Sequence, residues 1–350
     1  MRINQANKSL RVGIIGCGYI AGEADDSGER LDIYTHAKAI KHHPQMHLVA
    51  CCDTDDRKLH KFGDRWEVAT RYKSYSEMLT NECLDIVVIA TPTSTHYDIV
   101  FGVLEFPIAA VFCEKPLAET QNQARTLAEK AKKMNVALFV NFMRRWDPFY
   151  LECKNILSKE GIGRIETIVA YVDTALYMNA IHMIDILLMF GGRVESLSGV
   201  LDRRNQIRVV HDREDYGGVA TLLHRNGAYS FIKATGASRR NHYFELDIQC
   251  TEGRLRMLGD GDEYEIYQFN EIKEKPWLSE LRLQKRVRNS RSSQRMTSAY
   301  ANISDTISNC APIRSSGEQS LEVLEIIEKW YVSDQNNGVW ITIDGSDADV

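Results

Sequence analysis

Short apolar runs alternate with amphipathic segments over the first third of the chain. The runs are rich in Val, Ile, Leu and Ala, and they cover residues 12–15, 48–52, 84–90, 109–113 and 136–140. Runs of this length without polar alternation are typical of strands that are buried on both faces. The pattern therefore predicts an N-terminal α/β domain over residues 1–142, built on a doubly wound parallel sheet.

The pattern changes after residue 142. Apolar segments, several of them alternating with polar positions, follow in quick succession over residues 165–174, 218–223, 228–234, 243–250, 254–258 and 264–269. Turn signals separate them, and this spacing is typical of an antiparallel sheet with one exposed face. A strongly apolar helix is expected at residues 182–190 and a C-terminal helix at about 318–331. We predict a second, α+β domain over residues 143–350.

Composition narrows the range of functions. The 350 residues are 44% hydrophobic and 26% charged, with a formal net charge of -5, so nothing favours nucleic acid or an acidic membrane surface as partner. No apolar stretch reaches the roughly 18 residues that span a bilayer, and the polar N-terminus lacks a signal-peptide core, which predicts a cytoplasmic protein. The eight cysteines form no CxxC pair and the histidines show no ligand spacing. We expect reduced thiols and no metal.

A glycine-rich turn follows the first predicted strand. Residues 16–21, Gly-Cys-Gly-Tyr-Ile-Ala, fit the pattern G-x-G-x-x-A. The first glycine would form the turn, the second would let the backbone approach a pyrophosphate, and the small third residue would let helix and strand pack closely. Because the turn stands after an N-terminal strand, it predicts a Rossmann dinucleotide site with contacts from Gly16, Gly18, Tyr19, Ile20 and Ala21.

Asp53 closes the second predicted strand. A carboxylate there would accept hydrogen bonds from the adenosine ribose and repel a 2′-phosphate, which favours NAD, although Arg57 and Lys58 leave NADP open. Asp53 lies 35 residues after Gly18, where a spacing of about 20 is usual. The excess predicts an insertion around residues 23–34, either a solvated loop or a lid.

The run at residues 109–113 ends in Glu114-Lys115-Pro116. This ending delivers an ammonium group to the carboxyl edge of the sheet, where α/β proteins bind their ligands. The lysine would therefore stand beside the cofactor. The alternative is a surface lysine at a strand end that is paired with Glu114.

An ordered set of motifs resembles the glucose-fructose oxidoreductase / inositol dehydrogenase / rhizopine catabolism (Gfo/Idh/MocA) family. The set comprises the turn at 16–21, the strand at 85–90 with Thr91, Pro92 and His96, the Glu114-Lys115-Pro116 motif, and His182-x-x-Asp185. The resemblance extends from Arg11 to about Trp330. It implies a Rossmann domain, a C-terminal domain with a large open sheet that commonly builds homodimers or homotetramers, and NAD(P)-linked oxidation or reduction of a sugar-like alcohol. It also implies cofactor contacts from Thr91, Pro92, His96 and Glu114.

The resemblance assigns two catalytic roles. Lys115 would point at the oxygen of the reacting carbon, with a cis bond before Pro116, and could hydrogen-bond the substrate hydroxyl or assist proton movement. His182 matches the acid/base histidine of the family, since an imidazole titrates near neutrality. Its alternative is a capping or core histidine. Asp185 would be a structural partner on the same helix.

One position departs from the family pattern. Inositol-dehydrogenase-like enzymes carry an aspartate four residues before the histidine, and this chain has Met178 there, between Tyr177 and Asn179, which are candidate substrate contacts. The segment resembles that of relatives acting on nucleotide-linked sugars, in which lysine and histidine suffice. Alternatively, the chain has kept the cofactor site and lost the chemistry, as a ligand-sensing regulator.

Two further segments bear on the substrate. Residues 34–39 and 141–148 resemble the nucleotide-sugar subgroup, and Arg144, Arg145 and Trp146 just past a strand could meet a phosphate or a sugar hydroxyl. The alternative is that the arginines brace the domain junction. A basic run is a second candidate for a diphosphate, or else a mobile loop or oligomer arm: Arg282, Lys285, Arg286, Arg288, Arg291 and Arg295. The sequence thus favours an NAD(P)-dependent dehydrogenase or reductase of sugars or nucleotide sugars.

Overall fold

The computed structural model describes residues 9–25, 32–159, 161–204, 208–210, 213–234, 242–289 and 294–343. The chain divides into two compact units. Unit 1 comprises Met1–Asp147 and Ser292–Leu321, and unit 2 comprises Pro148–Arg291 and Glu322–Val350. Residues 292–321 therefore fold with the N-terminal unit, although they follow the strands of unit 2 in the sequence.

Unit 1 is built on a six-stranded sheet in the order β3-β2-β1-β4-β5-β6, with every neighbouring pair parallel. The strands are β1 (Leu10–Ile15), β2 (Met46–Cys52), β3 (Thr70–Tyr72), β4 (Ile86–Ile89), β5 (Ala110–Cys113) and β6 (Ala137–Val140). The five predicted apolar runs are five of these strands. The sequence pattern missed β3, since its three residues are only half-buried and form no apolar run.

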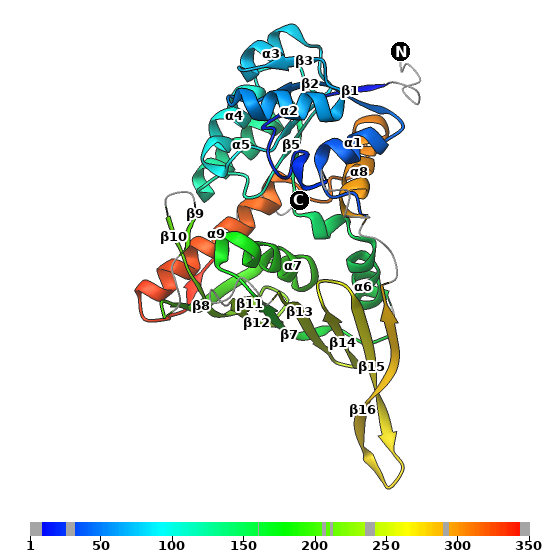
Figure 1. Cartoon of the computed structure of the whole chain (residues 1–350). Helices are drawn as coiled ribbons and strands as arrows, with labels where there is room; N and C mark the ends of the chain where they lie inside the picture. Colours follow the sequence, from blue (N-terminus) through cyan, green and yellow to red (C-terminus); the bar gives the residue numbers. More distant parts are fainter. Residues whose placement is uncertain are drawn as a thin grey trace. The chain divides into compact units, whose positions relative to one another are not determined.

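Helices cover both faces of this sheet, as the doubly wound prediction requires (Figure 1). Helices α1 (His36–His42), α2 (Asp56–Trp66) and α8 (Arg295–Asn309) share one core with Val12 and Ile14 of β1. Gly13 points to the other face, where a Cβ atom would lie 3.3 Å from Met78 of α3 (Tyr75–Asn81). Helices α4 (His96–Val103) and α5 (Gln121–Met134) pack with α3 on that side.

The predicted insertion interrupts the helix that follows the glycine-rich turn. In a continuous α-helix the carbonyl of Ile20 would accept from the N–H of residue 24. It instead accepts from the N–H of His36 at 3.1 Å, and the carbonyl of Ala21 accepts from Ala37 at 2.9 Å. The helix thus resumes at α1 after a short 3-10 turn (Glu23–Asp25) and a looped-out segment, which accounts for the long spacing to Asp53. Part of that segment lies outside the described residues.

Unit 2 carries a nine-stranded sheet in the order β16-β15-β14-β13-β7-β12-β11-β8-β17. Among the described strand pairs only β7 and β12 run parallel, which confirms the mainly antiparallel prediction. The bounds are β7 (Ile165–Val172), β8 (Val194–Asp202), β11 (Gly217–His224), β12 (Tyr229–Ala234), β13 (Phe244–Cys250), β14 (Gly253–Leu258), β15 (Glu263–Ile272), β16 (Lys275–Arg288) and β17 (Ile341–Thr342). A separate hairpin joins β9 (Arg208–Val210) to β10 (Arg213–Asp215).

Helices lie on one face of this large sheet. They are α6 (Pro148–Lys159), α7 (Ile181–Gly191) and α9 (Gly317–Gln335), whose residues from Glu322 onward belong to unit 2. On α9, Trp330 is fully buried and occupies the space beside Gly199, where a Cβ atom would lie 2.6 Å from the indole. The strands alternate buried and exposed positions, so the opposite face of the sheet is open.

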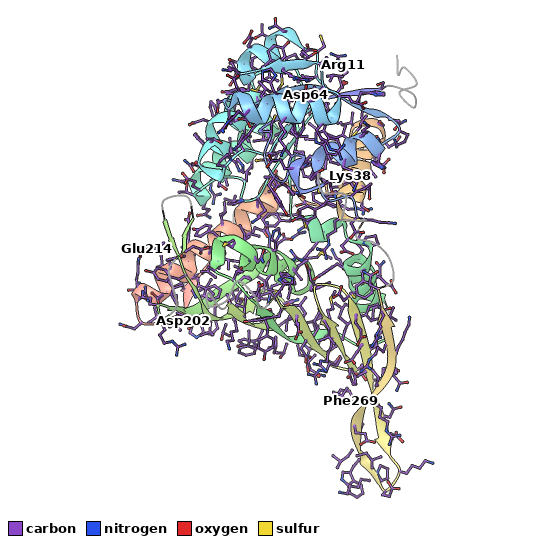
Figure 2. All side chains as sticks on the ribbon, viewed as in Figure 1. Arg11, Lys38, Asp64, Asp202, Glu214 and Phe269 are labelled. Carbon is purple, nitrogen blue, oxygen red and sulfur yellow. The ribbon has the colours of Figure 1, made fainter. Side chains whose placement is uncertain are left out.

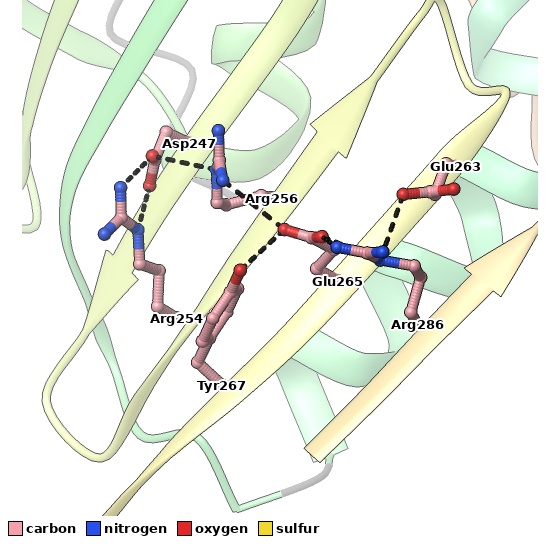
Figure 3. Close-up of polar contacts among 7 residues, drawn as sticks. All are labelled: Asp247, Arg254, Arg256, Glu263, Glu265, Tyr267 and Arg286. Carbon is pink, nitrogen blue, oxygen red and sulfur yellow. Dashed lines mark hydrogen bonds and ion pairs between the residues drawn. The ribbon is translucent and has the colours of Figure 1, made fainter. Parts of the chain in front are cut away.

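The basic run predicted as a loop or arm is mostly a strand, so the loop prediction is wrong. Four of its residues lie in β16, which forms a long ribbon with β15 that carries Phe269 (Figures 1 and 2). Acids of β15 pair with these cations: Arg286 contacts Glu263 and Glu265, as Figure 3 shows within a ladder of charges across the sheet. Arg291 lies outside the described residues. Because carboxylates pair with Arg282, Arg286, Arg288 and Arg295, these cations are poor candidates for a diphosphate site.

Candidate active site

The glycine-rich turn stands at the carboxyl end of β1. Gly16 has φ +91°, and a Cβ atom there would lie 2.7 Å from the backbone of Ala90. The N–H of Gly16 donates to the carbonyl of Cys52 at 2.8 Å. At Gly18 a Cβ atom would meet no heavy atom of the described residues within 4 Å, so the backbone there is open to a ligand. Only glycine fits the first position, and the second leaves room for a close approach.

Asp53 is held at the end of β2 by two backbone groups. Its Oδ2 accepts from the N–H of Cys17 at 2.8 Å, and its Oδ1 accepts from the N–H of Asp55 at 2.8 Å. Asp55 in turn caps α2. These bonds tie the carboxylate of Asp53 to the glycine-rich turn and fix its orientation.

A cavity of about 880 Å³ lies along the ends of β1, β2 and β4. Seven of the predicted cofactor residues line it, namely Gly16, Gly18, Tyr19, Ile20, Asp53, Thr91 and Pro92. Lys58, Lys73 and Tyr75 also line it, of which the sequence had indicated only Lys58. Ala21 is fully buried beneath the turn, consistent with a packing role.

His96 connects two loops of unit 1. Its Nδ1 lies 2.7 Å from the carbonyl oxygen of Pro116, and its Nε2 lies 2.8 Å from that of Thr91. Burial lowers the pKa of His96 more than these carbonyls and Glu114 raise it, and the charge of Lys115 lowers it further. The ring therefore lies between the loop that carries Lys115 and the loop that lines the cavity, and in its neutral form it donates to one of the two carbonyls.

Lys115 follows β5, is half-buried, and precedes Pro116 through a cis peptide bond, as the family resemblance implied. The neighbouring Glu114 does not line the cavity. Its Oε1 lies 2.9 Å from Nε2 of His36 and accepts from Nδ2 of Asn141 at 2.6 Å. Sequence reasoning gave no role to His36 or Asn141 individually, because both are distant from Glu114 along the chain.

The residues after β6 that the sequence suggested as substrate contacts are buried. Arg144 and Arg145 are buried in a 3-10 turn, Met143–Trp146. Trp146 is fully buried, its indole N–H donates to Oδ1 of Asn302 at 3.1 Å, and its ring packs edge-on against Phe112. A side chain in this position stabilises the core of unit 1 and has no surface left for a sugar.

In unit 2, His182 lies in the first turn of α7, directly after a π-helical turn, Leu176–Ala180. Both His182 and Asp185 are buried. Two side chains hold the backbone of the π turn. The N–H of Tyr177 donates to the carboxylate of Asp215 at 3.1 Å, and the N–H of Asn179 donates to Thr174 Oγ1 at 2.9 Å. π turns occur frequently at functional sites, and no periodicity in the sequence had indicated this one.

A second acid of unit 2 lies beside this turn. Asp173 is buried, its Oδ1 accepts from Nδ2 of Asn179 at 3.4 Å, and its Oδ2 lies 2.8 Å from Nδ1 of His242. Sequence reasoning missed both Asp173 and His242. The only signal was their place next to predicted strands, which many polar residues share.

Two family profiles match the chain in order. Residues 10–142 match the oxidoreductase family with an NAD-binding Rossmann fold, and residues 173–343 match the C-terminal alpha/beta domain of the same family. This chain belongs to the Gfo/Idh/MocA oxidoreductase family. Membership accounts for both units and their order along the chain.

Other Gfo/Idh/MocA-like proteins are distant relatives. D-apiose dehydrogenase of Paraburkholderia graminis is 27% identical over 276 residues, which are 72% of this chain and 68% of that protein. Myo-inositol 2-dehydrogenase of Thermotoga maritima is 28% identical over 155 residues, 44% of this chain and 42% of that protein. The WlbA dehydrogenase of Bordetella pertussis, solved with NADH and UDP-GlcNAcA, has the same fold: TM-score 0.76, 21% identity, covering 96% and 99% of the two chains.

The N-terminal unit of this Gfo/Idh/MocA protein is thus an NAD-binding Rossmann fold, and its relatives include enzymes named as sugar and inositol dehydrogenases. Two negative findings apply to the described residues. No helix among them is long and apolar enough to cross a membrane, and no group of three or more His, Cys, Asp or Glu side chains among them could hold a metal ion.

Buried histidines make the stability of the Gfo/Idh/MocA chain depend on pH. Burial lowers the pKa of His96 and of His224 from 6.5, so below about pH 6.5 the unfolded chain binds protons that the folded chain does not. We expect the free energy of unfolding to decrease as the pH falls from 7 to 5, measured by urea denaturation. His96→Gln should reduce this slope by up to about 1.4 kcal/mol per pH unit. A slope identical to that of the wild type would contradict the assignment.

Proposed function

We propose that this chain is an NAD(P)-dependent oxidoreductase that transfers a hydride between the nicotinamide cofactor and a secondary alcohol or ketone of a sugar or nucleotide sugar. The observation that carries the proposal is the connection through His96. This one buried ring contacts the carbonyl of Thr91, which lines the cavity, and the carbonyl of Pro116, which follows Lys115. An ammonium group is thereby held in a loop bonded to the cofactor cavity.

The cavity suits a dinucleotide. Gly16 and Gly18 would hold the pyrophosphate, because the first makes the tight turn and the second leaves the backbone open. Asp53 would accept from the ribose hydroxyls, with its carboxylate already oriented by Cys17 and Asp55. Bound NAD supplies the hydride acceptor at C4 of its nicotinamide ring.

Two residues supply the remaining chemistry. Lys115 hydrogen-bonds the carbinol or carbonyl oxygen of the substrate and polarises it. His182 takes the alcohol proton in oxidation and returns it in reduction, since an imidazole exchanges protons near neutral pH. Met178 occupies the position of the family aspartate, so Lys115 and His182 act without the aspartate of the Lys-Asp-His triad.

Asp53 selects between the two cofactors. Replacing it with Asn removes the charge that repels a 2′-phosphate, while Lys58 and Lys73 of the same cavity remain. We expect Asp53→Asn to weaken NAD binding by about tenfold and to strengthen NADP binding relative to NAD, since a lost bond to a charged group costs about 1.5–3 kcal/mol. Isothermal titration with both cofactors measures this. An unchanged ratio of NAD to NADP affinity would show that Asp53 does not contact the ribose.

The experiment that tests the function is a two-stage screen. Thermal shifts are measured first with NAD and NADP, and then with D-apiose, myo-inositol and a panel of UDP-, GDP- and CMP-linked sugars. Ligands that stabilise the protein are next assayed for turnover at 340 nm. Stabilisation by one sugar class together with nicotinamide turnover supports the proposal. Stabilisation without turnover by any member supports instead a cofactor-binding regulator, the alternative that Met178 in the acid position leaves open.

We also propose a homo-oligomer that forms through the open face of the nine-stranded sheet. Five large apolar side chains on this face are each 42–48% exposed: Tyr171, Val200, Val219, Tyr229 and Phe231. Strand register places Val219 directly opposite Val200, while Lys233 lies between Val219 and Tyr171, so the apolar side chains gather on this face around one lysine. An apolar patch of this kind is typical of a subunit interface.

Light scattering after gel filtration tests this interface. We expect a dimer or tetramer for the wild type, and a monomer for the double variant Val219→Glu/Phe231→Glu, because burying two carboxylates costs several kcal/mol. Met134→Glu is the control, since Met134 is similarly exposed (42%) but lies on α5 in unit 1. A monomeric wild type would refute the oligomer.

A further inference from the structure

Four buried polar side chains of unit 1 form a connected chain that ends next to Lys115. His36 begins α1, Glu114 follows β5, Asn141 follows β6, and Tyr300 lies in α8. The fully buried ring of His36 has Nδ1 2.8 Å from the hydroxyl of Tyr300 and Nε2 2.9 Å from Oε1 of Glu114. Nδ2 of Asn141 donates to the same oxygen at 2.6 Å. Two side chains that are remote in sequence thus contact one carboxyl group, and Tyr300 contacts one of them, His36.

The direction of the hydrogen bonds follows from the protonation states of Glu114 and Tyr300, the two groups that His36 contacts. Burial alone would raise the pKa of Glu114, but His36, Asn141 and the charge of Lys115 lower it, so Glu114 is a carboxylate that only accepts. Nε2 of His36 therefore carries a proton and donates to it. Burial, with the charge of Glu114, raises the pKa of Tyr300, so its hydroxyl keeps its proton and can donate to Nδ1.

The looped-out insertion sets the position of His36. Asp25, itself buried, accepts from the backbone N–H of Thr35 at 2.9 Å and of Tyr34 at 3.3 Å. The N–H of His36 then donates to the carbonyl of Ile20. The backbone that carries the imidazole is therefore anchored on both sides of the insertion.

Stability alone does not explain this network of hydrogen-bonded side chains in the core. Desolvating a carboxylate and an imidazole is costly, and apolar replacements of similar volume are often neutral or stabilising. The aromatic side chains around His36, among them Phe112 at a ring distance of 5.2 Å, could fill the space without it. The neighbour with a proposed chemical role is Lys115, which directly follows Glu114 in the chain and is half-buried.

We propose that His36 and Tyr300 are positioning residues that fix the Glu114 carboxylate, and that Glu114 in turn holds the Lys115 ammonium in its working orientation. The role rests on the proposed oxidoreductase function. None of the three residues needs to touch the substrate. Their effect on turnover passes through Lys115, and this dependence can be measured.

A double-mutant cycle between His36 and Lys115 tests the dependence. Four full-length proteins are compared: wild type, His36→Gln, Lys115→Ala and the double variant. The assay uses NAD with whichever of myo-inositol, D-apiose and UDP-GlcNAcA turns over, and NADH affinity is measured separately by fluorescence. We expect His36→Gln to lower kcat by about tenfold or more, the scale of a misplaced catalytic group, while the Kd for NADH changes by less than about twofold. In the Lys115→Ala background the same change should alter kcat by less than about twofold.

The outcomes separate positioning from simple stability. A loss of the same factor in both backgrounds would overturn the proposal, because His36 would then act independently of Lys115. An NADH affinity that falls as much as kcat would also overturn it, since the network would then hold the cofactor site as a whole. Tyr300→Phe, which removes only one hydroxyl, should lower kcat in the same direction as His36→Gln and by a smaller factor.

A second measurement applies when the wild type turns over none of the three sugars. That result counts against the proposed function, while the network is still tested by ¹⁵N NMR of the histidine rings. His36, assigned by its loss in His36→Gln, should carry its proton on Nε2, and Tyr300→Phe should shift its Nδ1 resonance. A proton on Nδ1 with Nε2 bare would overturn the positioning role, because Glu114 would then lack its donor.

Discussion

Replacing Lys115 with alanine is expected to lower kcat by about 10² to 10⁴, the range for groups that move or polarise a reacting proton. The ammonium stands in a loop that His96 bonds to the wall of the cofactor cavity, so its loss removes polarisation of the substrate oxygen. Binding of NADH should change little, because the glycine-rich turn and Asp53 remain. Initial rates at 340 nm and fluorescence titration with NADH measure the two quantities.

Two further variants sharpen this test. Lys115→Arg keeps the positive charge but cannot give up a proton, so activity close to that of alanine would assign a proton-handling role, and substantial activity would assign polarisation alone. Lys130→Ala is the control, since Lys130 is a largely covered lysine of unit 1 that packs over Phe101, away from the cavity lining. Full activity of Lys115→Ala would refute a catalytic role for this lysine.

Replacing His182 with asparagine is expected to lower kcat by about a hundredfold or more. Asparagine keeps a hydrogen-bonding side chain of similar size but cannot exchange a proton near neutral pH. Because His182 lies in unit 2 and the glycine-rich turn lies in unit 1, NADH affinity should stay within about twofold of the wild type.

His224 provides a matched control for this variant. It is a fully buried histidine of the same unit, bonded to Gly192 and Ser230, so His224→Asn reports what the loss of a buried imidazole does to stability alone. We expect His224→Asn to lower the melting temperature and to leave kcat close to that of the wild type. If His182→Asn retains wild-type turnover, a core or capping histidine is the correct interpretation, and the proton must be moved by another group.

Much of the fold could be predicted because apolar runs report burial directly. The five runs of the first third became β1, β2, β4, β5 and β6, and the change to alternating positions marked the second sheet. Three of the elements that the pattern missed show the physical reasons. Strand β3 is too short and too exposed to form a run, β16 is dominated by cations whose partners lie on another strand, and α8 returns to unit 1 through contacts that no local pattern records.

The candidate site also contains residues that the sequence could predict and residues that it could not. Gly16, Gly18 and Asp53 were predictable, since a tight turn and a strand-end acid have local signatures. The looped-out helix was predictable only as an excess in spacing. His36 and Asn141 contact Glu114 from two distant elements, and Tyr300 contacts His36 from a third. The π turn before His182 depends on Asp215, which lies beyond the next strand. Contacts of this kind arise from tertiary packing, which a single sequence does not encode in any local pattern.

Transfer of deuterium from carbon to the cofactor tests the proposed chemistry most directly. The sugar that turns over in the screen is supplied with deuterium on its ring carbons, and NADH formed by the wild type is analysed by mass spectrometry. Hydride transfer predicts NADH that is one mass unit heavier, with the label on C4 of the nicotinamide ring. NADH that forms without the label would contradict an oxidoreductase acting on a sugar CH–OH group.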